Sequence, residues 1–171
     1  MSPNNERVPP QNLEAEMSLL GAILIDTEAL IKIADLVDRD DFYKQAHGDI
    51  FAVMVELYSR HEPVDLVTVS NRLEEKTLLE KVGGRGYLVS LSNTVPTAAH
   101  IKHYATLVRR KATLRKLLTA ASAITELSYQ EEEDVEKVLD AAQQSVFGVT
   151  QKHLKQNFTD IRLVLHDAFE R

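Results

Sequence analysis

Apolar residues recur every three or four positions along most of the chain, which is the spacing of one face of an α-helix. Between residues 12 and 95 these runs are short and are separated by polar turns. The expected helices contain residues 13–24, 27–37, 50–58, 66–76 and 77–82, with one or two further turns over 87–91. Because residues 64–69 also alternate as in a strand, a strand at the start of the fourth helix stays open.

Residues that stabilise helix ends stand at the boundaries of these runs. The expected N-caps are Asn12, Asp26 and Asp65. Thr77 and Glu80 have the spacing of a capping box, which would open the short helix before Gly83. Gly21 lies inside the first helix, where glycine is unfavourable by about 1 kcal/mol relative to alanine. We therefore expect a close helix crossing at Gly21.

After the turn at residues 95–97 the periodic runs are much longer. Thr97 is expected to cap a helix that reaches about residue 128, and a second long helix is expected over about 132–150. Since only a short turn near 128–130 separates them, the two helices should form an antiparallel hairpin.

The polar residues 151–158 predict a linker after the hairpin. Thr159 is then expected to cap a tail helix whose apolar face carries Ile161, Leu165 and Phe169. Because no C-cap signal follows, the end at Arg171 is expected to be a truncation. The predicted all-α organisation is a flexible arm (1–11), a compact head of short helices (12–96), a hairpin (97–150), a linker (151–158) and a tethered helix (159–171).

The hairpin carries more apolar surface than two helices can bury against each other. The residues expected to mediate self-association are Leu114, Leu117, Leu118 and Ala121 on the first helix and Leu139, Ala142 and Val146 on the second. A second hairpin would cover them by completing a four-helix bundle. The alternative is that the head covers the same residues, although the hairpin is longer than the helices of the head.

The net charge of −6 disfavours DNA as the main partner, because phosphate neutralisation supplies most of the affinity of duplex-binding domains. A basic stretch occupies residues 109–116 and an acidic stretch occupies 131–136. These stretches either contact DNA or an acidic partner, or form the solvated faces of paired helices.

Motifs for chemistry are missing from the sequence. The chain has no cysteine and no phosphate-binding loop of the G-x-x-x-x-G-K-[ST] type. His100 and His103 share a helix face without a nearby third ligand, and the glycines at 83–86 suit a helix stop and tight turn. We expect no catalytic, cofactor or metal site. No apolar run reaches the roughly 18 residues of a membrane span, so a cytoplasmic protein is expected.

Several sequence blocks together resemble the N-terminal domain of bacterial DnaB-type replicative helicases. The blocks are Pro9-Pro10-Gln11-Asn12-Leu13-Glu14-Ala15-Glu16, Leu20-Gly21-Ala22-Ile23-Leu24, Asp41-Phe42-Tyr43, His47, Ile50-Phe51, Met54, Pro63-Val64-Asp65-Leu66-Val67-Thr68-Val69, Gly83-Gly84, Tyr87-Leu88, Val95-Pro96-Thr97-Ala98-Ala99 and Tyr104-Ala105. They span roughly residues 8–150 in the order and spacing of that family.

The resemblance implies a role in DNA replication. Members of the family are ring hexamers that unwind DNA with ATP and Mg²⁺ in a motor domain that is missing here. The resemblance further implies a trimer-of-dimers collar that recruits primase and takes part in helicase loading, with DNA contacted at most weakly. The tail helix would pack on a neighbouring motor domain. Tyr87, Ile124 and Tyr129 are the candidates for primase docking.

A free-standing helical DNA-binding regulator is the alternative function. It would need a basic recognition helix and a basic surface, which the charge of −6 opposes. A small enzyme is opposed by the missing catalytic motifs.

Overall fold

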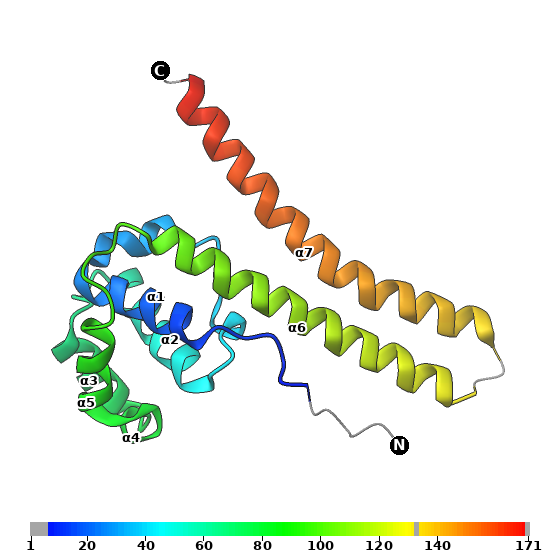
Figure 1. The fold of residues 1–171 in the computed structure, drawn as a ribbon, viewed down its shortest axis with the longest axis horizontal. Coiled ribbons are helices and arrows are strands. Elements are labelled where there is room, and N and C mark those ends of the chain that lie inside the picture. Colours follow the sequence, from blue (N-terminus) through cyan, green and yellow to red (C-terminus); the bar gives the residue numbers. More distant parts are fainter. Residues whose placement is uncertain (1–6, 132–133, 170–171) are drawn as a thin grey trace. The chain divides into compact units, whose positions relative to one another are not determined.

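The computed structural model describes residues 7–131 and 134–169 (Figure 1). Throughout these two ranges every regular element is a helix and no strand occurs, which confirms the all-α prediction. The chain divides into two compact units, one formed by Gln11–Ala112 and the other by Met1–Pro10 together with Thr113–Arg171. We call residues 11–112 the head unit and residues 113–169 the hairpin unit.

Short helices build the head unit. They are α1 (Leu13–Ile25), the 3₁₀ helices η1 (Thr27–Lys32) and η2 (Arg39–Asp41), α2 (Gln45–Ser59), α3 (Leu66–Glu75), α4 (Leu79–Val82) and α5 (Gly84–Ser92). Two long helices follow, α6 (Ile101–Tyr129) and α7 (Val135–Phe169). The start of α6 belongs to the head unit, and its remainder belongs to the hairpin unit.

Three of the predicted N-caps are confirmed by hydrogen bonds. Asn12 accepts from the backbone N–H of Ala15 at 2.9 Å, and Asp26 accepts from that of Glu28 at 3.1 Å. Asp65 accepts from the third N–H of α3 at 2.8 Å. Because α3 is helical from its first residue, the strand alternative over 64–69 is wrong.

Three predictions at helix ends are wrong. Thr97 does not cap α6, which begins at Ile101: the Thr97 hydroxyl accepts from the N–H of Ala99 at 2.8 Å in the turn before that helix. The helix expected over 27–37 is a 3₁₀ helix that ends at Lys32. Thr77 does not cap α4: it has φ 57° and ends α3 instead, with the N–H of Leu78 donating to the carbonyl of Leu73 at 2.8 Å. This bond, together with that from Thr77 N–H to the Glu74 carbonyl at 2.9 Å, forms a Schellman motif. Thr77 therefore belongs to the C-terminal cap of α3 and does not cap α4.

The core of the head unit takes side chains from every α-helix of the unit and from the start of α6. The largest fully buried side chains are Leu19, Leu20, Ile23, Leu30, Ile33, Ile50, Met54, Leu57, Leu73, Leu88, Leu91 and Ile101. Ala105 and Val108 of α6 belong to the same core. The unit therefore extends to Ala112, beyond the boundary expected at residue 96.

The close crossing expected at Gly21 is confirmed. A Cβ atom added to Gly21 would lie 2.2 Å from the carbonyl oxygen of Leu91 in α5. Real Cβ atoms do not approach a backbone oxygen so closely, so α1 and α5 cross at this distance only with glycine at position 21.

α7 runs in the opposite direction to the second half of α6, and a short turn that contains Glu131 joins the two helices (Figure 1). The expected start of α7 at residue 132 lies outside the described residues. The helix break expected at 151–158 is wrong, because α7 continues through Thr159 to Phe169. The segment is polar, but it contains neither proline nor glycine, and its lysines and glutamines are good helix formers.

Candidate functional site

Two apolar stripes of the hairpin unit lie exposed to solvent. The α6 stripe consists of Leu114, Leu117, Leu118 and Ala121, and the α7 stripe consists of Leu139, Ala142 and Val146. Leu118 is 53% exposed and Leu139 is 59% exposed, whereas Ala142 is half-buried. The spacing of three, four and seven residues places each stripe along one side of its helix.

The side chains that the hairpin shields are different ones. On α6 Ala120 is buried, and Ile124 and Leu127 are half-buried. On α7 Val138 and Val149 are half-buried. Ala142 has the same intermediate burial as Val138 and Val149, whereas the other residues of the two stripes remain exposed to solvent.

Sequence reasoning missed two exposed apolar residues on α7. Phe147 is 60% exposed and Leu154 is 54% exposed. Leu154 fell in the segment expected to be a linker, and Phe147 lies beside the α7 stripe. Their spacing of seven residues, which places both at nearly the same angle around a helix, was the available signal.

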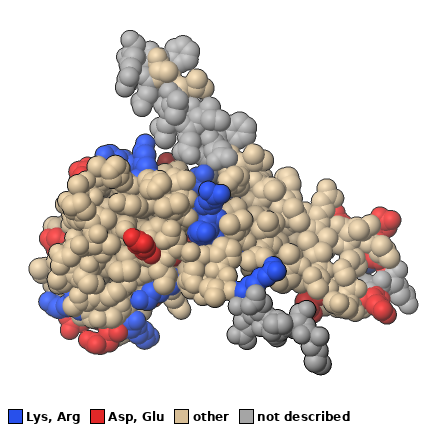
Figure 2. Space-filling view, in the orientation of Figure 1, with Lys and Arg blue, Asp and Glu red and all other residues tan. Residues whose placement is uncertain are grey.

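Figure 2 shows the charges on one face of the molecule. In this view uncharged side chains cover most of the hairpin, and acidic side chains gather near its turn. The acids at this end include Glu131, Asp134 and Glu136, all exposed. An uncharged surface flanked by acids suits contact with a protein better than contact with nucleic acid.

The three candidates for primase docking have different surroundings. Tyr129 at the end of α6 is 80% exposed, whereas Ile124 on the same helix is half-buried. Tyr87 belongs to the head unit, is half-buried, and has its hydroxyl 2.6 Å from Nε2 of His47. Tyr129 is thus the candidate whose side chain is most available to a partner.

The tail candidates lie at the end of α7. Leu165 is exposed. The side-chain surroundings of Ile161 and Phe169 lie outside the described residues.

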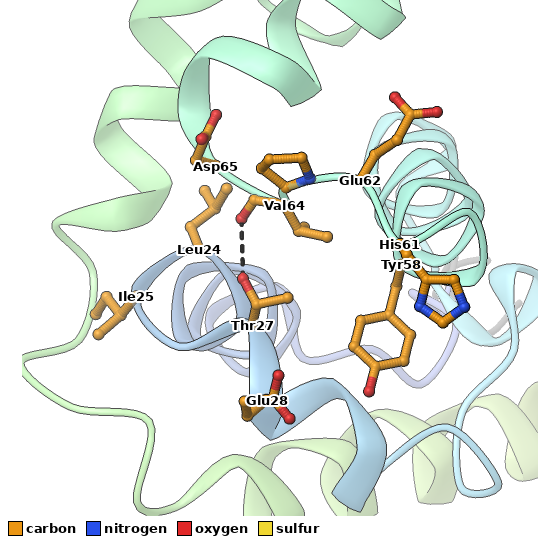
Figure 3. Close-up of a pocket in the computed structure, with 10 residues that line it drawn as sticks. Leu24, Ile25, Thr27, Glu28, Tyr58, His61, Glu62, Val64 and Asp65 are labelled. Carbon is orange, nitrogen blue, oxygen red and sulfur yellow. Dashed lines mark hydrogen bonds between the residues drawn. The ribbon is translucent and has the colours of Figure 1, made fainter.

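A cavity of about 620 Å³ opens on the head unit between the end of α1 and the segment that joins α2 to α3 (Figure 3). Its lining residues are Leu24, Ile25, Thr27, Glu28, Tyr58, His61, Glu62, Pro63, Val64 and Asp65. Glu62 pairs with Arg72 at 3.0 Å, and Asp65 caps α3. The hydroxyl of Thr27 donates to the carbonyl of Val64 at 3.3 Å. These polar groups stabilise the framework of the fold.

Metal ligands and membrane spans were searched among the described residues. Within them, no group of three or more His, Asp or Glu side chains is placed to hold a metal ion. No helix in the same part of the chain is both long and apolar enough to cross a membrane.

Comparisons with known proteins connect this fold to DNA replication. The replicative DNA helicase DnaC of Bacillus subtilis is 42% identical over 166 residues, which are 97% of this chain and 37% of that protein. The replicative DNA helicase DnaB of Geobacillus stearothermophilus is 38% identical over 166 residues, with the same coverage of both chains. The chain thus spans 37% of the length of these relatives.

Solved structures share the fold. The crystal structure of the N-terminal domain of DnaB helicase from Mycobacterium tuberculosis has a TM-score of 0.79 and 39% identity, covering 83% of this chain and 99% of that one. A DnaB-like replicative helicase, described together with its interactions with primase, has a TM-score of 0.68 and 24% identity over 88% of this chain and 35% of that one.

The family described as the DnaB-like helicase N terminal domain matches residues 8–110, which include nearly all of the head unit. The matched range covers the buried core, the α1–α5 crossing at Gly21 and the start of α6. With the fold and the relatives in agreement, this chain belongs to the DnaB-like helicase N-terminal domain family.

Proposed function

We propose that this chain is the non-catalytic assembly and partner-docking region of a replicative DNA helicase. The observation that carries the proposal is the exposure of the α6 and α7 stripes in a family whose relatives are replicative helicases. ATP hydrolysis, with its Mg²⁺, would belong to a motor domain outside this sequence. Purified chain should therefore hydrolyse no more ATP than a matched helical control protein, and turnover that survives rigorous purification would contradict the proposal.

Self-association through the stripes follows from the hydrophobic effect. Complete burial of an exposed leucine contributes roughly 1.5–3 kcal/mol, and the stripe leucines, which are about half exposed, would each gain about half of this on association. Burial of several of them in both copies opposes the entropy lost on association. A second hairpin offers the complementary surface, because an isologous contact brings each stripe to its counterpart. Two hairpins then complete a four-helix bundle, and three such dimers would form the hexameric collar.

Aspartate substitutions test this interface. Leu118→Asp and Val146→Asp should each raise the dimer dissociation constant at least about tenfold, because an unpaired charge in an apolar interface is unfavourable by several kcal/mol. Light scattering over a concentration series measures the change. Thr119→Asp is the matched control, since Thr119 is exposed on α6 and is not three, four or seven residues from any residue of the stripe.

Circular dichroism should show unchanged helix content in all three variants. If both stripe variants keep the mass and dissociation constant of the wild type with the fold intact, the interface lies elsewhere.

Primase docking is the proposed partner function, and a helicase loader would use the same collar. Support comes from the solved DnaB-like helicase described with its interactions with primase. Tyr87, Ile124 and Tyr129 are the proposed contacts, and the exposed Tyr129 is the strongest of them. A large aromatic side chain that becomes buried is typical of a binding hot spot.

Calorimetry with the C-terminal region of primase tests these contacts. Tyr129→Ala should weaken binding by about tenfold or more, the effect of losing a hot-spot residue. Ile124→Ala and Tyr87→Ala are compared with it, and Tyr43→Ala replaces an exposed tyrosine of the head unit as the control. Wild-type affinity in all three test variants would discard these positions.

The end of α7 is proposed to dock on the motor domain of a neighbouring subunit through Ile161, Leu165 and Phe169. The exposure of Leu165 supports this assignment. In the whole helicase, Leu165→Asp should loosen the hexamer and leave the head unit folded. An unchanged hexamer in native mass spectrometry would remove Leu165 from the contact.

A further inference from the structure

Three side chains from three helices form a buried polar chain in the head unit. Nδ1 of His47 in α2 lies 2.6 Å from a carboxylate oxygen of Glu16 in α1. Nε2 of the same ring lies 2.6 Å from the hydroxyl oxygen of Tyr87 in α5. Glu16 is 2% exposed and His47 is 1% exposed, whereas Tyr87 is half-buried and reaches the surface. The chain therefore runs from the interior of the protein to solvent.

Both oxygens of the Glu16 side chain act as hydrogen-bond acceptors. One of its oxygens accepts the backbone N–H of Tyr43 at 2.5 Å, and the other accepts that of Lys44 at 3.4 Å. Because a carboxylate only accepts hydrogen bonds, the 2.6 Å contact with Glu16 requires Nδ1 of His47 to carry a hydrogen.

The protonation state of His47 then decides how the Tyr87 hydroxyl is used. In the neutral ring Nδ1 carries the hydrogen, so Nε2 is an acceptor and Tyr87 donates its hydroxyl hydrogen inward. In the imidazolium both nitrogens donate, so the Tyr87 oxygen must accept from Nε2. Both contacts survive, but the hydrogen bond between His47 and Tyr87 reverses its direction.

We propose that the Glu16–His47–Tyr87 chain is a proton-responsive switch that converts the surface hydroxyl of Tyr87 from an outward acceptor into an outward donor. The proton that enters resides on Nε2 of His47, and Glu16 balances its charge across the 2.6 Å contact at Nδ1. The hydroxyl hydrogen of Tyr87, no longer directed at His47, turns to solvent or to an acceptor on a bound molecule.

Lys44 is the other charged group at the outer end of the chain. Its ammonium nitrogen lies 3.5 Å from the Tyr87 hydroxyl oxygen and 4.6 Å from the centre of the ring. Lys44 can donate to the Tyr87 oxygen when His47 is neutral, because the lone pairs of that oxygen are then free. Protonated His47 would compete for that oxygen and place a second positive charge beside it, so the Lys44 contact should loosen. The groups in direct contact with His47 or Tyr87 thus include Glu16 from α1 and Lys44 before α2.

Nitrogen-15 NMR of the histidine rings in the whole chain tests the starting state without any substitution. Above its titration, His47 should show the tautomer with hydrogen on Nδ1, and exposed His100 in the same spectrum serves as the reference. The opposite tautomer, with hydrogen on Nε2, would overturn the proposal, because Nε2 would then already donate to Tyr87.

The output of the switch is measured at Tyr87. The ¹³Cζ shift of Tyr87 should change with pH at the same midpoint as the His47 ring nitrogens. A Tyr87 signal that stays constant through the His47 titration would show that the hydroxyl does not follow the proton, and the switch would be refuted.

Two variants complete the test. Tyr87→Phe should lower the midpoint of the His47 titration, because the hydrogen on Nε2 of the protonated ring would lose its acceptor. Glu16→Gln should lower it further, since the balancing charge is gone. Tyr58→Phe is the matched control and should leave the midpoint unchanged. A midpoint equal to that of the wild type in folded Tyr87→Phe would overturn the coupling.

Discussion

The head unit and the hairpin unit both carry many leucines, but these leucines differ in how far they are exposed to solvent. Leu19, Leu73 and Leu88 of the head unit are 0% exposed, whereas Leu118 and Leu139 of the hairpin unit are 53% and 59% exposed. In the head unit several short helices cross at many angles and enclose a core from all sides. Two antiparallel helices have a single seam, so every apolar residue away from that seam stays in water. The difference in exposure of these leucines arises from topology.

The two units also use glycine differently. Gly21 lies where α1 approaches the backbone of α5, and an added Cβ would clash with the Leu91 carbonyl. Gly148 lies in α7 with nothing within 4 Å of an added Cβ. The head unit is thus held by close backbone contacts, and the same residue type in the hairpin has no such function.

The largest expected effect separates buried from exposed leucine. Leu19→Ala should reduce the free energy of unfolding by about 3–5 kcal/mol, because it leaves a cavity in a closed core. Leu118→Ala should reduce it by less than about 1 kcal/mol in the monomer, since the side chain is already in water. Urea denaturation at low protein concentration measures both. Equal losses would mean that Leu118 is covered within the monomer, and the comparison would fail.

The glycine pair should give the next largest effect. Gly21→Ala is expected to reduce the free energy of unfolding by about 1–3 kcal/mol, because α1 and α5 must move apart. Gly148→Ala should raise it by up to about 1 kcal/mol, since alanine is the better helix former and meets no neighbour. Thermal unfolding of both variants tests the pair. A stabilising Gly21→Ala would show that the crossing is looser than the structure indicates.

Helix ends offer a smaller contrast. Thr77 closes α3 with φ 57°, a conformation that is unfavourable for a β-branched residue. Thr77→Gly should therefore stabilise the chain by about 1 kcal/mol. Thr119→Gly in the middle of α6 should destabilise it by roughly 0.5 kcal/mol. If the denaturation midpoint shifted in the same direction for both substitutions, the contrast between an end and an interior position would be contradicted.

The smallest expected effect is electrostatic and is confined to the head unit. The Lys76 ammonium and the Arg72 guanidinium, at 2.9 and 2.6 Å, hold the pKa of Glu56 below its ordinary value of 4.5, and the same carboxylate raises the pKa of Arg72. A lowered pKa in the folded state contributes stability above the ordinary pKa, and this contribution is lost as the pH falls through the lowered value.

Glu56→Gln should therefore flatten the acid limb of the stability curve below about pH 5. Urea midpoints from neutral to acidic pH measure this change, with exposed Glu136→Gln in the hairpin as the control. Because salt screens charges at the surface, the difference should shrink at high ionic strength. An identical acid limb in the wild type and Glu56→Gln would remove this cluster from the pH dependence.

Local features of the fold could be predicted from the sequence because their causes are local. Asn12, Asp26 and Asp65 cap the helices that they precede, and each bond spans two or three residues. Prediction failed where two local signals competed. Thr77 fits the capping-box pattern, but it forms the C-terminal cap of α3 and so does not cap α4. The polar composition of 151–158 predicted a break, but polarity alone does not end a helix, and α7 continues through this segment.

By itself, the sequence determined the all-α class, several of the helix ends and the spacing of the apolar stripes, because helical periodicity and capping act over a few residues. The exposure of Leu118 and Leu139 was decided only by the tertiary structure, since it depends on which side of each helix faces the seam. The contact of His47 with Glu16 and Tyr87 was also decided there. These residues lie 31 and 40 positions from His47 in the chain, and they meet only because the packing of the core brings three helices together.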